Sequence, residues 1–190
     1  MKIKLMVLAV TAAFGFSSMG YAALSKEERK AENTRIEADY KAAKERCKDL
    51  KGNTKDVCMA EAKGAQKVAK ADLEAKDKGT PKAQANARVA KAEADYNVAK
   101  EKCDDMSGNA KDVCKKDAKA AFTRAKSEAN VQKEAKEAGK DARERVADAR
   151  KEANQDTRQA EYKAARERCD SMSGDAKDRC VSEVKARYGK

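Results

Sequence analysis

Six cysteines are the residues of this 190-residue chain whose type and spacing could carry chemistry. Paired thiols can form a disulfide, bind zinc or work as a redox motif. Zinc sites use closer cysteine spacings or histidine, and the chain contains no histidine. Catalytic redox pairs prefer Cys-x-x-Cys, which is absent. We therefore predict structural disulfides that pair each cysteine with the one eleven positions later: Cys47 with Cys58, Cys103 with Cys114, and Cys169 with Cys180.

Other catalytic chemistry lacks the residues that it needs. A cysteine nucleophile requires an imidazole base, and haem attachment requires a histidine after a Cys-x-x-Cys pair. The sequence also contains no phosphate-binding loop and no recognisable metal-binding motif. These observations predict a protein that is not an enzyme and that uses no cofactor and no metal.

Each cysteine pair lies in one copy of an internal repeat. The copies are EADYKAAKERCKDLKGNTKDVC at 37–58, EADYNVAKEKCDDMSGNAKDVC at 93–114 and AEYKAARERCDSMSGDAKDRC at 160–180. Three matches of this length predict three helical units, at 23–79, 80–139 and 140–190. Six cysteines allow 15 pairings, and the repeat selects the pairing within each copy.

A glycine between the two cysteines of each copy predicts a tight turn between two helices. The glycine suits the left-handed residue that ends a helix, the next residue suits an N-cap, and the acid three positions later suits the first turn of the second helix. The two cysteines are equally far from this turn, so a disulfide could join the two helices there. The residues are Gly52, Asn53 and Asp56; Gly108, Asn109 and Asp112; and Gly174, Asp175 and Asp178.

A second repeated pattern predicts an apolar seam within each hairpin. A tyrosine lies seven positions before the first cysteine, and Leu or Met lies three positions after it, in a heptad-like spacing. These residues are Tyr40, Tyr96 and Tyr162, with Leu50, Met106 and Met172. We expect the tyrosines to pack against small residues on the partner helix, including Ala65, Ala121 and Ala186.

The composition predicts an all-α protein built from long helices rich in Ala, Lys and Glu. Charged residues make up 41% of the chain, aromatic residues only 4%, and there is a single proline. We predict helices at about 26–51, 54–78 and 81–107. The segment 110–173 is interrupted only by Gly139, which could be a turn, a hinge or a tolerated residue in one continuous helix. Because large apolar residues are few, we favour an elongated arrangement of disulfide-closed antiparallel hairpins over a loose antiparallel bundle.

The N-terminus predicts export. Lys2 and Lys4 precede an apolar stretch that is too short to span a bilayer comfortably, and small residues follow it. This order is typical of a cleavable signal peptide at 1–22. We therefore expect a periplasmic protein with no membrane span after signal removal, in a compartment where paired cysteines oxidise.

The ADYKAAKERC…GNAKDVC pattern behind a signal peptide resembles a group of small secreted proteins of Gram-negative bacteria. These proteins are often labelled cell envelope biogenesis protein TolA, and the resemblance covers nearly the whole chain. It implies a periplasmic role in the cell envelope. It transfers no catalytic or binding residue to this chain.

Two functions from different classes fit these observations. The first is a structural or protein-interaction protein of the cell envelope, whose partner is an unknown envelope protein or a second copy of the chain. The second is a cationic protein that binds anionic envelope polymers such as lipopolysaccharide, or nucleic acid, since the net charge is +11. Acids interleave with the bases throughout, which favours a solvated helix surface and only weak polymer binding.

Overall fold

A computed structural model describes residues 24–137 and 142–190. The predicted signal peptide at 1–22 and the predicted turn or hinge at Gly139 lie outside the described residues. The described part forms six α-helices and contains no strand, which confirms the predicted all-α class. The helices are α1 (Lys26–Arg46), α2 (Gly52–Lys78), α3 (Pro81–Cys103), α4 (Gly108–Lys136), α5 (Ala142–Cys169) and α6 (Gly174–Tyr188).

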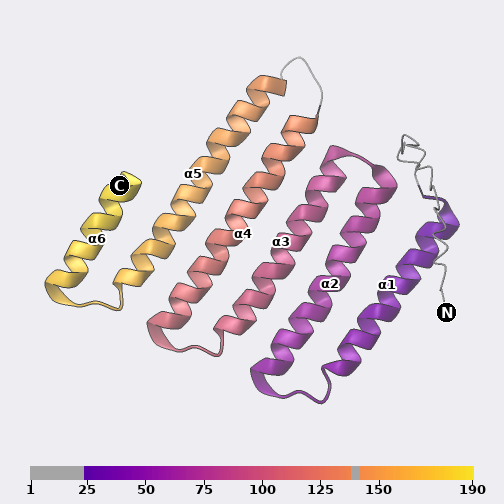
Figure 1. The fold of residues 1–190 in the computed structure, drawn as a ribbon, viewed down its shortest axis with the longest axis horizontal. Helices are drawn as coiled ribbons and strands as arrows, with labels where there is room; N and C mark the ends of the chain where they lie inside the picture. The colour runs from indigo at the N-terminus through magenta and orange to yellow at the C-terminus, as the bar shows by residue number, and fades with distance from the viewer. Residues whose placement is uncertain (1–23, 138–141) are drawn as a thin grey trace, which may run out of the picture.

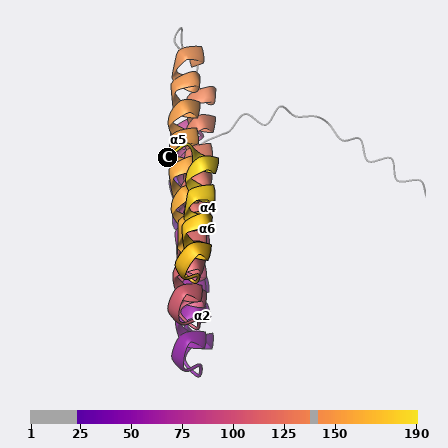
Figure 2. The same ribbon diagram turned by 90° about the vertical axis from the view of Figure 1, so that its left-hand side faces the viewer.

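The helices stand side by side in a single layer (Figure 1). Figure 2 shows the layer edge-on, where it is one helix thick. Within the described residues, each helix contacts only the helices before and after it in the sequence. Successive helices are antiparallel, so the chain folds as a flat meander with two broad faces open to solvent.

The continuous helix considered for 110–173 is wrong. α4 ends at Lys136, and α5 begins at Ala142 and packs back along α4 (Figure 1). The preference for an elongated arrangement assumed that few large apolar residues could not hold long helices together. Alanine holds them instead, because its small side chain lets two helix backbones approach closely.

Local signals explain where the helices begin and end. The Ser25 hydroxyl accepts a hydrogen bond from the Glu28 backbone N–H at 3.1 Å, and the Glu28 carboxylate accepts one from the Ser25 N–H at 2.9 Å. This capping box begins α1. Between α2 and α3, Gly79 adopts φ 61°, Thr80 caps the next helix and Pro81 is its first residue. No described helix is long and apolar enough to cross a membrane.

The core consists mostly of alanine and lies in the seams between helices. α3, in the middle of the layer, buries alanines on two opposite sides. Where α2 meets α3, a Cβ added to Gly64 would come within 2.9 Å of the Ala94 Cβ, so the two backbones are in close contact there. No polar or charged residue is buried in the described part of the chain. The buried apolar residues are Ile36, Cys47, Ala62, Leu73, Ala83, Ala85, Ala87, Ala90, Ala92, Ala94, Cys103, Ala120, Ala129, Ala149, Ala164 and Cys169.

Candidate functional site

The three disulfides form as predicted. Cys47 bonds to Cys58, Cys103 to Cys114 and Cys169 to Cys180, each with a Cα–Cα distance of 5.7 Å. No cysteine is left free. The three disulfide-closed turns lie along one end of the layer, while the turn between α2 and α3 lies at the other end (Figure 1). One end of every hairpin is therefore fixed covalently.

The glycine of each turn takes the predicted left-handed conformation. Gly52, Gly108 and Gly174 have φ values of 56°, 53° and 54°. Each glycine begins the second helix, however, instead of ending the first. The first helix stops at the level of the first cysteine, and the chain turns through a short bond such as Met106 N–H to the Cys103 carbonyl, at 3.0 Å. The predicted helix ends at 51 and 107 were therefore too late.

The predicted N-caps are also wrong, because the second helices begin at the glycines. The residues before the glycines, Lys51, Ser107 and Ser173, are the N-caps, and none of their side chains makes a capping hydrogen bond. Asn53, Asn109 and Asp175 lie inside the second helices. Because those helices begin early, Asp56, Asp112 and Asp178 are exposed beyond the first turn, and the first turns of α2 and α4 contain no acid. Asp175 is the one acid in the first turn of α6.

The asparagine after the glycine instead reaches the next hairpin. Asn109 Nδ2 donates a hydrogen bond to the Glu167 backbone oxygen at 2.8 Å, which joins the tip of α4 to the end of α5. In the first hairpin, the Nδ2 atom of Asn53 is buried and has no hydrogen-bond partner within the described residues. Asp175, in the last hairpin, is exposed. Sequence reasoning missed this contact, although the change from Asn to Asp in the last copy was visible.

Tyrosines lie in the seams within the hairpins, but not against the predicted alanines. Tyr96 stacks on Phe122 with ring centroids 5.4 Å apart, and Tyr162 meets Tyr188 edge-on at 6.0 Å. Tyr40 is half-buried without an aromatic partner in the described residues. Ala65, Ala121 and Ala186 are exposed, so the expected tyrosine–alanine packing is wrong. The aromatic partners were not predicted, because Phe122 and Tyr188 lie outside the repeated segments.

The prediction that Leu50, Met106 and Met172 pack in the seam is also wrong. Met106 and Met172 are 46% and 45% exposed, and Leu50 is half-buried. All three lie after the end of the first helix, so the heptad spacing no longer applies to them. Basic side chains cover the tyrosine rings instead: Lys44 lies 5.5 Å from the Tyr40 ring centroid and Lys119 lies 5.4 Å from that of Tyr96.

Ion pairs join one hairpin to the next. Glu61 in α2 pairs with Lys102 in α3 at 3.7 Å, and Asp117 in α4 pairs with Arg168 in α5. Each acid lies three positions after the second cysteine of a hairpin, and each base lies directly before the first cysteine of the next hairpin. The pairing was not predicted, because it joins residues of different repeats.

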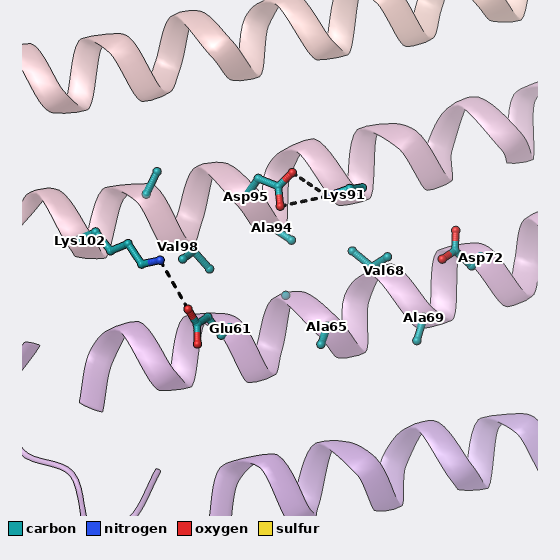
Figure 3. A pocket seen from close by; sticks show the side chains of 12 residues that line it. Glu61, Ala65, Val68, Ala69, Asp72, Lys91, Ala94, Asp95, Val98 and Lys102 are labelled. Carbon is teal, nitrogen blue, oxygen red and sulfur yellow. Dashed lines mark hydrogen bonds and ion pairs between the residues drawn. The ribbon is translucent and has the colours of Figure 1, made fainter. Parts of the chain in front are cut away.

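A shallow groove of about 710 Å³ runs between α2 and α3 on one face of the layer (Figure 3). Gly64 and Ala94 let the helices approach, and Val68 and Val98 add apolar surface beside them. The Glu61–Lys102 pair crosses the groove, and Lys91 and Asp95 form a 2.9 Å pair on α3 (Figure 3). An apolar floor with charged borders suits contact with another protein segment.

Lysines in the second helices of two hairpins perturb carboxyl groups in the closed turns. Hydrogen bonds from Lys111 and Lys115, each at 2.8 Å, lower the pKa of Asp104 from 3.8 to about 2. A hydrogen bond from Lys177 at 2.9 Å lowers the pKa of Asp170 in the same way. Both acids directly follow the first cysteine of their hairpin and tie the turn to the second helix. Because these carboxylates are stabilised in their charged form, they brace the turns and are poorly suited to accept protons as bases.

The described residues contain no group of three or more His, Cys, Asp or Glu side chains placed to hold a metal ion. Disulfides, aromatic contacts and ion pairs position the helices around the closed turns. Comparison with known proteins found no protein-family model, no curated protein and no solved structure that matches this chain.

Proposed function

We propose that the chain is a non-enzymatic structural or protein-interaction protein of the bacterial cell envelope, stapled by disulfides and located in the periplasm. One observation carries this proposal: all six cysteines are paired, at equivalent positions along one end of the layer. Structural disulfides persist in oxidising compartments and are rare in the cytosol. The signal-like N-terminus and the resemblance to secreted envelope proteins support the same compartment.

The shape of the layer supports an interaction role. Each helix is covered by its sequence neighbours along its two sides, so both broad faces remain accessible over the described residues. The groove between α2 and α3 presents apolar surface there. A flat layer with one covalently fixed end can hold partners at set positions along its length, as a scaffold or spacer.

A cationic binder of anionic envelope polymers is the second candidate. Lys119 and Lys126 are exposed and seven positions apart on α4, so they lie on the same face of that helix. Many other lysines are neutralised by acids on neighbouring helices, as Lys67 is by Glu93 at 2.5 Å and Lys70 by Glu37 at 2.6 Å. This pairing lowers the charge available to a polymer and favours the first candidate.

Fractionation with thiol trapping tests the proposed function. Cells are treated with an alkylating reagent before lysis, and the protein is followed in periplasmic and cytoplasmic fractions. We expect a periplasmic protein with no alkylated cysteine. A reduced cytoplasmic pool as the main form would overturn the proposal.

Salt dependence separates the two candidates. Retention on immobilised lipopolysaccharide is compared with in-cell crosslinking to envelope proteins, at about 50 and about 200 mM salt. Binding to anionic polymers weakens steeply over this range, whereas contacts through helix seams persist. Strong retention at about 50 mM salt that is largely lost at about 200 mM, without any protein crosslink, would favour the polymer binder.

A further inference from the structure

Neighbouring hairpins contact each other through the same repeat positions in two separate seams. An acid three positions after the second cysteine pairs with a base directly before the next hairpin's first cysteine, as Glu61 does with Lys102 and Asp117 with Arg168. The recurrence shows that this pair belongs to the register of one hairpin against the next. These pairs are exposed, so they select the register and contribute little energy.

The two edge helices carry the unused halves of the same pair. In α6, Glu183 lies three positions after Cys180; in α1, Arg46 lies directly before Cys47. Both side chains are exposed. Within the described residues no helix follows α6 and none precedes α1, so each edge presents one member of an ion pair that the chain forms twice internally.

The small residues of the internal seams recur at these edges. Ala120 in α4 and Ala164 in α5 are 7% and 3% exposed, and helical spacing places them on the same faces as the Asp117–Arg168 pair. Their repeat equivalents are Ala186 in α6 and Ala42 in α1, and both are exposed. The edges therefore combine matching charge with the small side chains that let backbones approach.

A second charge pair follows the same rule in part. Arg124 in α4 pairs with Glu161 in α5. Asp39 in α1 has the position equivalent to Glu161 and the same charge, whereas Lys190, equivalent to Arg124, lies beyond Gly189, after α6 has ended. One ion pair, one alanine contact and the acid of a second ion pair of the α4–α5 seam thus have their counterparts on opposite edges of one chain.

We propose that copies of this chain associate edge to edge, with α6 of one copy packed antiparallel against α1 of the next. The inference rests on the proposed interaction function and names its partner, a second copy of the chain. The contact is heterologous, because two different surfaces meet, so it continues the flat layer from copy to copy instead of closing a two-fold dimer. Arg46 of one copy pairs with Glu183 of the other, as Arg168 pairs with Asp117 within the chain.

Two features of α6 limit the strength of this contact. The helix has 15 residues, about 22 Å at 1.5 Å per residue, so the new seam is shorter than the internal ones. Asp175 stands where Asn109 donates its hydrogen bond to a backbone oxygen, and a carboxylate cannot donate it. The association is therefore weak and depends on concentration, and Asp175→Asn is expected to strengthen it.

Sedimentation velocity of the purified full chain, from micromolar to millimolar concentration, tests the contact. Arg46→Glu and Glu183→Lys should each weaken the association about two- to fivefold, and the double variant should restore it because the charges are exchanged. Lys44→Glu is the matched control: it reverses an exposed base of α1 that lies two positions before Arg46, on the opposite side of the helix, over the ring of Tyr40. It should leave the association unchanged.

A chain that stays monomeric at millimolar concentration overturns the inference. So does a loss of association with Arg46→Glu but not with Glu183→Lys, because this pattern indicates that two α1 edges meet. Neither result touches the proposed envelope role, which fails only if the protein is found reduced in the cytoplasm. Circular dichroism of each variant confirms that a change in association is not caused by unfolding.

Discussion

Two kinds of seam alternate across the layer, and they differ in the interactions that join the two helices. The seams within hairpins (α1 with α2, α3 with α4, and α5 with α6) have a disulfide at one end, and in two of the three an aromatic pair lies further along. The seams between hairpins (α2 with α3 and α4 with α5) contain no disulfide. Ion pairs occur in both kinds of seam, as Glu37–Lys70 within a hairpin and Glu61–Lys102 between hairpins show, and α2 and α3 are in close backbone contact at Gly64. The between-hairpin seams are the more extensive.

The difference shows where covalent bonds are needed. The outermost helices, α1 and α6, each have a neighbour on one side only, and their seams are the least extensive in the layer. A disulfide closes each of these two seams, and the third disulfide closes the more extensive seam between α3 and α4. Long antiparallel helices such as α2 and α3 bury enough alanine to pack without one, although the chain has few large apolar residues to offer.

Removal of the Cys169–Cys180 disulfide should have the largest effect. Replacing both cysteines by alanine should destabilise the attachment of α6 by about 3 kcal/mol, because the bond closes a loop of about twelve residues. α6 contacts only α5, so it should lose its protection against hydrogen exchange while α2 and α3 keep theirs. Hydrogen exchange with mass spectrometry measures both.

The Cys103–Cys114 pair provides the matched control for this prediction. Its replacement removes the same kind of bond, but α4 remains packed against α5 and the Tyr96–Phe122 stack still joins it to α3. Loss of protection should therefore be confined to the turn. If either replacement unfolds the whole chain, all seams belong to one cooperative core, and the within-hairpin and between-hairpin seams do not unfold independently.

Enlarging Gly64 should disrupt a between-hairpin seam without touching a disulfide. A Cβ at this position would lie 2.9 Å from the Ala94 Cβ, so Gly64→Leu forces α2 and α3 apart and should cost about 1–3 kcal/mol. Ala65→Leu is the control, because Ala65 is exposed on the same helix. Urea unfolding followed by circular dichroism compares the two. Equal stabilities would mean that close approach at Gly64 does not hold the seam.

The within-hairpin features were more predictable from the sequence than the between-hairpin ones. The repeat identified the disulfide partners, because each copy contains both, and it identified the left-handed glycines, because φ above zero is a local property. The contacts of Asn109 and of Asp117 join different repeats, and no signal within one copy points to them. The flat layer follows from these contacts, so the sequence predicted helices and hairpins but not their arrangement.

Errors within the hairpins have one common physical cause. The prediction extended each first helix up to the glycine, whereas the chain leaves the helix near the first cysteine. Because the first helices end early, Met106 and Met172 lie outside the seam. Because the second helix begins at the glycine, Asp56 lies beyond its first turn. Helix ends depend on the turn that follows, and here the disulfide-closed turn occupies the residues that propensity assigned to the helix.

The smallest expected effect concerns the acid that directly follows the first cysteine. Asp104 and Asp170 occupy this position in the second and third hairpins, where lysines lower their pKa values, while the first hairpin has Lys48 there. A pKa lowered by folding adds stability above the ordinary value of 3.8 for Asp104, and this stability is lost as the pH falls toward about 2. Replacing Lys111 and Lys115 together by methionine should therefore raise the pKa of Asp104 toward its ordinary value, which an NMR titration of the side-chain carboxyl carbon measures.

Lys119→Met, further along the same helix, should leave the pKa of Asp104 unchanged, because Lys119 lies against the Tyr96 and Phe122 rings instead. An unchanged Asp104 titration in the double variant would show that these lysines do not brace the turn of the second hairpin.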